Sequence, residues 1–232
     1  PLKPTVPTLW YGSLPNQIQV SGVENQEIPA ISITITLPGG RRVESASEAG
    51  LASLTAMLVR QGSQRLNAEA LSEELQRLGS TISFSAASYN TVIQVSSLAE
   101  NLPRTLQLVE ELLISPGLRE SDFNRVKNQL LQGLRQQEQD PSAMADHAFY
   151  PLIYGADSPL AWPDSGTVAT ISALSLAQVK AYYQHYYFPA GGKVVARFAQ
   201  YASIEAGGDV LLASQLLHTE VRTPGCVLVA DE

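Results

Sequence analysis

The sequence has few of the residues on which metal sites and disulfides depend. Its 232 residues include one cysteine, Cys226, and three histidines, His147, His185 and His218. A single cysteine excludes an intramolecular disulfide and a metal site built on several cysteines. The histidines are far apart and lack the short spacing of zinc ligands. We therefore interpret Cys226 as a small buried residue and the histidines as ordinary imidazoles.

Positive charge and long apolar runs are also scarce. The sequence has 15 Lys and Arg residues against 22 Asp and Glu residues, which gives a net charge of −7. The basic residues are scattered and form neither a nucleic-acid-binding stripe nor a polybasic membrane patch. There is no apolar run of about eighteen residues and no signal peptide. We expect no nucleic-acid partner and no transmembrane segment, and because the sequence begins with Pro1 we expect a piece of a longer protein.

The most informative stretch is Gly50–Ser63, which predicts an almost wholly apolar helix. Ser47 and Glu48 precede it as cap and first-turn residues, and Gly62 follows it as a stop. A helix with so little polar surface belongs inside a domain. Its apolar residues recur at helical spacing: Leu51, Ala52, Leu54, Ala56, Leu58 and Val59.

The same stretch has a frame that is typical of one enzyme family. It opens with Gly50-Leu51-Ala52 and closes with Gly62-Ser63. It resembles the signature helix of the pitrilysin/insulinase-type zinc metallopeptidases, the inverzincins, which begins Gly-Leu-Ala, continues with the motif H-x-x-E-H and ends on Gly-Thr. Further matches follow in the family's order and together cover roughly residues 10–195: Leu14-Pro15-Asn16, Pro38-Gly39-Gly40 with Glu44, Leu78-Gly79-Ser80, Tyr154-Gly155, Gly166-Thr167 and Tyr186-Tyr187-Phe188-Pro189.

The resemblance assigns four functional positions, and none of them keeps its chemistry. The two histidine ligands of the family fall on Ser53 and Met57, the catalytic base falls on Ala56, and the third ligand falls on Gly133. Catalytic zinc needs about three ligands, normally imidazole, thiolate or carboxylate groups. A hydroxyl, a thioether and a glycine do not supply them, and Ala56 cannot take a proton from water. We predict that this chain is catalytically inactive and holds no cofactor of its own.

Gly133 allows a second interpretation. It lies inside a predicted helix, where glycine costs about 1 kcal/mol relative to alanine. It is either the lost ligand position or a point of close packing between two helices.

The element pattern predicts an α+β fold, with an antiparallel-rich mixed sheet and helices packed mainly on one face. The predicted strands are Asn16–Gly22, Ala30–Leu37, Thr81–Ala87, Thr91–Leu98 and Lys193–Phe198. The predicted helices after the signature helix are Asn67–Leu78, one that opens at Asn101-Leu102-Pro103 and ends at Pro116-Gly117, Arg119–Gln139, Pro141–Ile153, a short one near Gly166–Ile171, and Ser175–Tyr187.

The chain divides into three segments. Residues 1–15, with prolines at positions 1, 4, 7 and 15, predict an extended lead-in or linker. Residues 16–198 are expected to form the pitrilysin-like α+β domain. Residues 199–232 do not match the family; a diverged end, an altered reading of the coding sequence and a segment packed on the domain or elsewhere all fit them.

The resemblance implies a zinc-free half-unit from the second half of a longer zinc metalloendopeptidase. Members of that family pair such units into halves that enclose a chamber in which peptides are cut. The expected function is to wall the chamber and support the catalytic half, with zinc only in that half. The alternative is a purely structural scaffold subunit related to the core proteins of respiratory complexes.

The resemblance also implies partners and a location. The expected partners are other domains of the same protease or a catalytic subunit, peptide substrate, and a further copy of the chain. The aromatic helix Ser175–Tyr187 and the tail 199–232 carry more apolar residues than a solvated surface needs, and we expect them to form the docking surface. The sequence itself does not fix the location; the family favours a bacterial periplasm or cell envelope.

Overall fold

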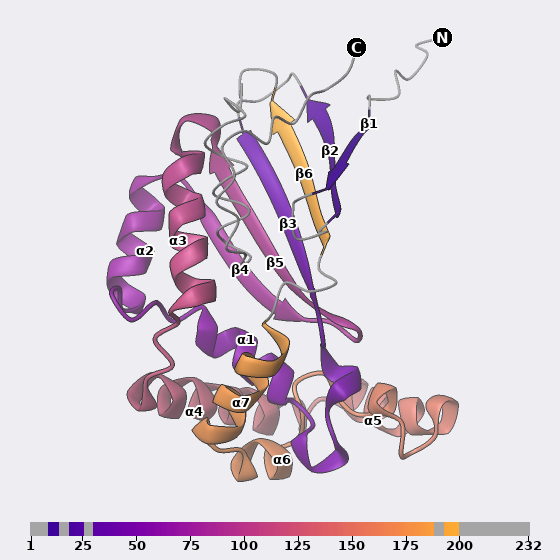
Figure 1. Cartoon of the computed structure of the whole chain (residues 1–232). Coiled ribbons are helices and arrows are strands. Elements are labelled where there is room, and N and C mark those ends of the chain that lie inside the picture. The colour runs from indigo at the N-terminus through magenta and orange to yellow at the C-terminus, as the bar shows by residue number, and fades with distance from the viewer. Residues whose placement is uncertain (1–8, 14–18, 26–29, 188–192, 200–232) are drawn as a thin grey trace.

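The computed structural model describes residues 9–13, 19–25, 30–187 and 193–199. These residues form a six-stranded sheet in the order β1-β2-β6-β3-β5-β4, with helices packed mainly on one of its faces (Figure 1). The β2 and β6 strands are parallel, and the other neighbouring strands are antiparallel. The predicted α+β class and the antiparallel-rich mixed sheet are confirmed. The strands are β1 (Leu9–Ser13), β2 (Gln19–Asn25), β3 (Ala30–Pro38), β4 (Thr81–Ala86), β5 (Asn90–Leu98) and β6 (Lys193–Ala199).

The β3 strand shows why the sheet has one buried face. Ile31, Ile33 and Ile35 are buried, whereas Ser32 between them is exposed. Alternation with a period of two places successive side chains on opposite faces of a sheet. The isoleucines therefore face the helices, and the Ser and Thr positions lie on the opposite face.

The helices occupy two parts of the molecule (Figure 1). Those nearest the sheet pack on its buried face, and the others lie beyond one end of it. No described helix combines the length and apolar character that crossing a bilayer requires. The helices are α1 (Leu51–Val59), α2 (Ala68–Arg77), α3 (Leu102–Ile114), α4 (Glu120–Gln137), α5 (Pro141–Tyr154), α6 (Val168–Ala173) and α7 (Leu176–Tyr186).

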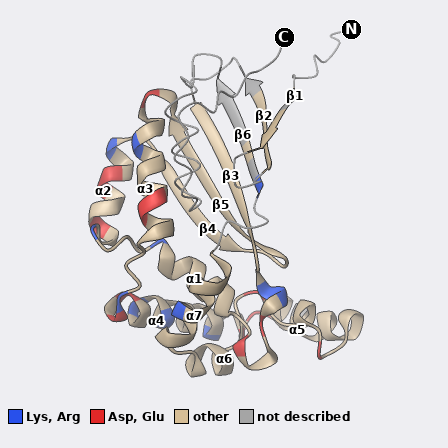
Figure 2. Cartoon of the chain, in the orientation of Figure 1, with Lys and Arg blue, Asp and Glu red and all other residues tan. Residues whose placement is uncertain are grey.

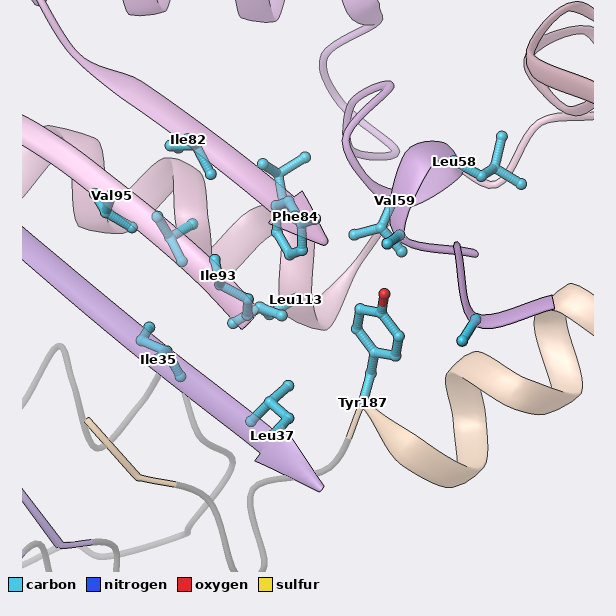
Figure 3. Packing of buried hydrophobic residues seen from close by; sticks show 14 of the residues in the cluster. Ile35, Leu37, Leu58, Val59, Ile82, Phe84, Ile93, Val95, Leu113 and Tyr187 are labelled. Atoms are coloured by element: carbon cyan, nitrogen blue, oxygen red, sulfur yellow. The ribbon is translucent and has the colours of Figure 1, made fainter. Parts of the chain in front are cut away.

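The core lies between the sheet and the helices. Figure 3 shows side chains of β3, β4 and β5 pointing toward those of α1 and α3, with the Tyr187 ring among them. Leu54, Leu58 and Val59 of α1 are each no more than 1% exposed. The prediction that the Gly50–Ser63 helix lies inside the domain is therefore confirmed.

The N-terminal prediction was wrong in part. The expected lead-in 1–15 contains β1, which pairs with β2 in antiparallel register from Leu9↔Val23 to Ser13↔Gln19. The prolines at positions 1, 4 and 7 lie outside the described residues, and the apolar and aromatic residues after them form the strand. The strand predicted at Asn16–Gly22 is described only from Gln19 and continues to Asn25.

The aromatic helix is also placed differently from our expectation. On α7, Tyr182 is 5% exposed, and Tyr187 just after the helix is 9% exposed. The Tyr182 hydroxyl donates to the Gly40 carbonyl at 3.0 Å, and the Tyr183 hydroxyl donates to the Leu113 carbonyl. These rings belong to the core of the domain and are not a docking surface. The other expected docking segment, 199–232, lies outside the described residues apart from Ala199.

Candidate functional site

The candidate site begins where the chain enters α1. Gly50 precedes the helix with a φ of 92°, and a Cβ atom there would meet the Ser165 carbonyl oxygen at 2.7 Å. Only glycine fits both the left-handed conformation and this close approach. Glu44 binds two of the free N–H groups at this helix start: its carboxylate accepts from Gly50 N at 3.1 Å and from Ala52 N at 2.6 Å.

Glu44 therefore takes the capping role that the sequence suggested for Ser47 and Glu48. The Glu48 carboxylate instead accepts from the backbone N–H of Ser45, which caps the short 3-10 helix Ala46–Glu48, at 3.4 Å. Glu44 is 7% exposed, and this burial raises the pKa of its carboxyl to about 7. The hydrogen bonds from Ala52 and Gly50 and the charge of Arg41 act in the opposite direction but do not outweigh the burial.

The first ligand position is engaged in a structural contact. The Ser53 hydroxyl donates to the Asp164 carbonyl at 2.6 Å, which ties α1 to the loop before α6. Hydroxyl groups are poor zinc ligands in comparison with imidazole. The side chain at this position thus fixes a loop.

The other two α1 positions are apolar; one is buried and the other is partly buried. Ala56 is 1% exposed, and Met57 is partly buried against the core. A methyl group cannot act as a base, and a thioether is a ligand for softer metals than zinc. Ala56 thus belongs to the core and Met57 borders it, and neither offers a group for the chemistry of the family.

Gly133 lies on α4, which packs beside α1. It is exposed, and a Cβ atom at this position would meet no atom within 4 Å. The interpretation of Gly133 as a point of close helix packing is therefore wrong. The structure brings the two helices of the resemblance together, but Gly133 offers no side chain to the site.

The donor set does not fit a zinc ion. The four positions supply a hydroxyl, a methyl, a thioether and a hydrogen atom. Among the residues that the structure describes, no three His, Cys, Asp or Glu side chains gather in a metal-binding group. His147 on α5 and His185 on α7 are exposed, while His218 and Cys226 lie outside the described residues.

A polar pocket of about 590 Å³ adjoins this site. It lies between α5, the β4–β5 turn and the segment before α6, and Asp164 and Ser165 belong to its lining. Arg41 lines it from the segment that leads into α1. The sequence analysis missed Arg41 and Asp164; the Pro38-Gly39-Gly40 turn just before Arg41 was the only local signal.

Comparison with known families and proteins gives a consistent result. A family model described as "Insulinase (Peptidase family M16)" matches residues 20–155. The curated relatives include the "Non-peptidase homolog YmxG" of Helicobacter pylori, 26% identical over 167 residues, which are 71% of this chain and 38% of that protein. They also include the "Cytochrome b-c1 complex subunit 1, mitochondrial" of Bos taurus, 24% identical over 185 residues, which are 79% of this chain and 38% of that protein.

Solved structures share the fold. The "peptidase M16 inactive domain" from Pseudomonas fluorescens matches with a TM-score of 0.81 at 21% identity, over 94% of this chain and 54% of that one. A "protease from Helicobacter pylori" matches with a TM-score of 0.79 at 20% identity, over 95% of this chain and 54% of that one. The chain thus spans about half the length of these structures and about two fifths of the length of the curated relatives.

Proposed function

The chain belongs to the insulinase family of M16 peptidases, and on that premise we propose that it acts as a non-catalytic unit of a larger M16 assembly. It pairs with a zinc-bearing unit, walls the chamber in which peptides are held, and supports the catalytic half. The zinc and the catalytic base come from the partner unit. The chain itself contributes a wall of the chamber and the surface that contacts the partner unit.

One observation carries this proposal. The α1 helix keeps its place in the core and its fixed entry at Gly50, while Ser53, Ala56 and Met57 have no ligand or base to offer. A fold that is retained around an emptied catalytic helix supports a role in assembly, because the packing is preserved and the chemistry is not.

The surface of α5 supports a docking role. Figure 2 shows charged residues on α2, α3 and α4, whereas α5 is almost free of them. Leu152 is 84% exposed, and Met144, Phe149 and Ile153 are each more than half exposed. Large apolar side chains that are exposed together on one helix are typical of an interaction site. We assign the α5 surface formed by these four residues to the contact with the zinc-bearing unit.

A purely structural role is the second candidate. The similarity to subunit 1 of the cytochrome b-c1 complex favours it, since that relative is one part of a larger complex. In this case the partner surface would be the same, but no peptidase activity would depend on the contact.

The test is to mix the chain with an M16 chain that has an intact H-x-x-E-H motif and is encoded in the same genome. We expect a defined complex in size-exclusion chromatography with light scattering, and higher peptidase activity than that of the zinc-bearing chain alone. A complex without a gain in activity would support the scaffold role. Absence of a complex with every such chain would overturn the pairing.

Matched variants locate the contact. The double substitution Leu152→Ser and Ile153→Ser removes apolar surface from α5, whereas Tyr89→Ser removes an aromatic ring that is 58% exposed on the β4–β5 turn. We expect the α5 variant to weaken the complex and the Tyr89 variant to leave it intact. Equal behaviour of the two variants would show that the contact lies elsewhere.

A further inference from the structure

The polar pocket beside α1 has one wall made by a single face of α5. Ala143, His147, Tyr150 and Tyr154 line it, and they follow one another at helical spacing. The rings of Tyr150 and Tyr154 lie nearly parallel, with an interplanar angle of 14° and centroids 6.3 Å apart. The volume of about 590 Å³ is in the range of small-molecule and side-chain pockets.

Arg41 supplies the positive charge of the pocket. Among the described lining residues it is the only Lys or Arg. Its guanidinium donates to the Trp162 carbonyl at 3.1 Å and to the Ser88 hydroxyl at 2.9 Å, and it pairs with the Asp164 carboxylate at 2.5 Å. These contacts from two segments, the β4–β5 turn and the stretch before α6, hold the planar donor group in a fixed orientation, which suits recognition of a carboxylate.

The two partners of this ion pair differ in their exposure. The Arg41 side chain is 10% exposed, whereas the Asp164 side chain is 71% exposed. A buried guanidinium without a counter-charge is strongly unfavourable, so Arg41 needs a carboxylate at this place. The Asp164 carboxylate is already 71% exposed, so it loses little hydration in the pair, and a second carboxylate can take its place without leaving Arg41 unpaired. Arg41 is thus the fixed partner and Asp164 the exchangeable one.

We propose that this pocket binds the carboxylate of a peptide, which replaces Asp164 on Arg41. The neighbouring part of the peptide lies against the rings of Tyr150 and Tyr154. The carboxylate belongs either to an Asp or Glu side chain or to a C-terminus. Because the pocket is formed by this chain alone, ligand binding there is independent of the pairing proposed above and fails or succeeds separately from it.

The second acidic residue of the lining favours a carboxylate over a phosphate. The Asp140 carboxylate accepts from Ser142 N at 2.9 Å and remains in the lining when Asp164 leaves. One fixed cation beside one fixed carboxylate suits a single negative charge better than a double one, since like charges repel.

Isothermal titration calorimetry of the whole chain tests the proposal with four peptides. Two are acetylated and amidated, Ala-Glu-Phe-Ala and Ala-Gln-Phe-Ala. The third is acetylated Ala-Gln-Phe-Ala with a free C-terminus, and the fourth is the acetylated and amidated Ala-Lys-Phe-Ala. We expect binding of the Glu peptide, of the free C-terminal peptide, or of both, which identifies the source of the carboxylate. Binding of the Lys peptide alone, or of none, would overturn the proposal.

The variant Asp164→Asn gives the sharper readout because it predicts a gain. Removal of the competing carboxylate should tighten carboxylate binding by about fivefold. The control Asp157→Asn changes the same charge at an exposed position that does not line the pocket, and should leave the affinity unchanged. Arg41→Lys should abolish the binding, with circular dichroism confirming the fold. Weaker or unchanged binding by Asp164→Asn would refute the exchange.

Discussion

The α1 and α5 helices are both apolar in composition but have opposite surroundings. Both are rich in apolar residues; α1 has no charged residue, and Asp146 is the one Asp, Glu, Lys or Arg of α5. Seven of the nine residues of α1 are buried, whereas none of the described side chains of α5 is. The first helix packs against β4, α4 and α7, while the second lies apart from the sheet (Figure 1).

The difference shows what apolar composition can and cannot predict. An apolar composition predicts that a helix surface will be buried against another surface. It does not say whether that surface belongs to the same domain or to a partner. The α1 helix is buried by other elements of its own domain. We propose that α5 is buried by another unit of the assembly. The same substitution in the two helices should therefore change the stability of the isolated chain by different amounts.

The largest contrast is expected from a new glutamate. Ala56→Glu restores the residue type of the catalytic base but places a carboxylate at a position 1% exposed, and should destabilise the chain by about 3–5 kcal/mol. Ala148→Glu on the exposed surface of α5 should change the stability by less than about 0.5 kcal/mol. Urea unfolding measures both. A similar small effect at both positions would show that α1 is not a packed core helix.

Restoring the whole zinc site should also destabilise the chain, because it includes the same buried glutamate. A variant with Ser53→His, Ala56→Glu, Met57→His and Gly133→Glu should bind zinc weakly and show little peptidase activity, because we expect the residues that orient such ligands to have changed together with the ligands. Metal analysis and a peptidase assay test this. Robust turnover by a variant as stable as the parent would contradict it.

The next contrast comes from removal of leucine side chains. Leu54→Ala creates a cavity at a residue that is 0% exposed and should cost about 2–5 kcal/mol. Leu152→Ala makes the same chemical change at 84% exposure and should cost less than about 0.5 kcal/mol. Denaturant midpoints of the two variants give the comparison. A large loss at Leu152 in the isolated chain would mean that α5 is already covered.

The stability of the chain should depend on pH because of the buried Glu44 at the start of α1. Burial raises the pKa of the Glu44 carboxyl to about 7 from 4.5, so the folded state binds its proton more tightly than the unfolded state. The resulting stabilisation is full below about pH 4.5 and is lost as the pH rises through 7, by up to about 3 kcal/mol. Glu44→Gln should remove this slope from unfolding curves measured across that range. A slope that persists in the variant would have another origin.

The smallest effects are expected at two glycines with open space around them. Gly133→Ala adds a methyl group in an exposed helix and should stabilise the chain by about 0.5–1 kcal/mol. Gly155→Ala, where α5 ends, meets no atom either, but the φ of 81° should make it destabilising by about 1 kcal/mol. Thermal unfolding of the two variants shows whether each substitution raises or lowers the stability. Equal signs would mean that the backbone at one of the two positions differs from that described.

Much of the fold follows from local patterns in the sequence. The alternation of β3 and the periodicity of α1 each have one physical solution, a half-buried strand and a buried helix, and both were predicted. The starts of two helices at Asn67 and Ser175 were predicted as well, and both residues cap their helices, because a side-chain oxygen before a helix binds its free N–H groups within a few residues.

The predictions that failed concern residues whose role depends on a contact with a residue far away in the sequence. Glu44 caps α1 across six residues through a turn, which no local capping pattern shows. The tyrosines of α7 look suitable for a docking surface until Gly40 and Leu113, far away in the sequence, accept their hydroxyl groups. Arg41 and Asp164 lie 123 positions apart by their numbers and meet only in the folded chain. The four emptied positions could be assigned from the motif, whereas the pocket beside them could not.

The position of β6 has a consequence for synthesis of the chain. This strand, the last one described, lies between β2 and β3 and pairs with both. Until residues 193–199 leave the ribosome, the β1–β2 hairpin has no ladder to the β3–β5–β4 group. Both groups then present an open strand edge, which is a template for pairing with another chain. A nascent chain stalled before β6 should therefore depend on chaperones to avoid aggregation, although most of its helices and its hydrophobic core residues have already been made.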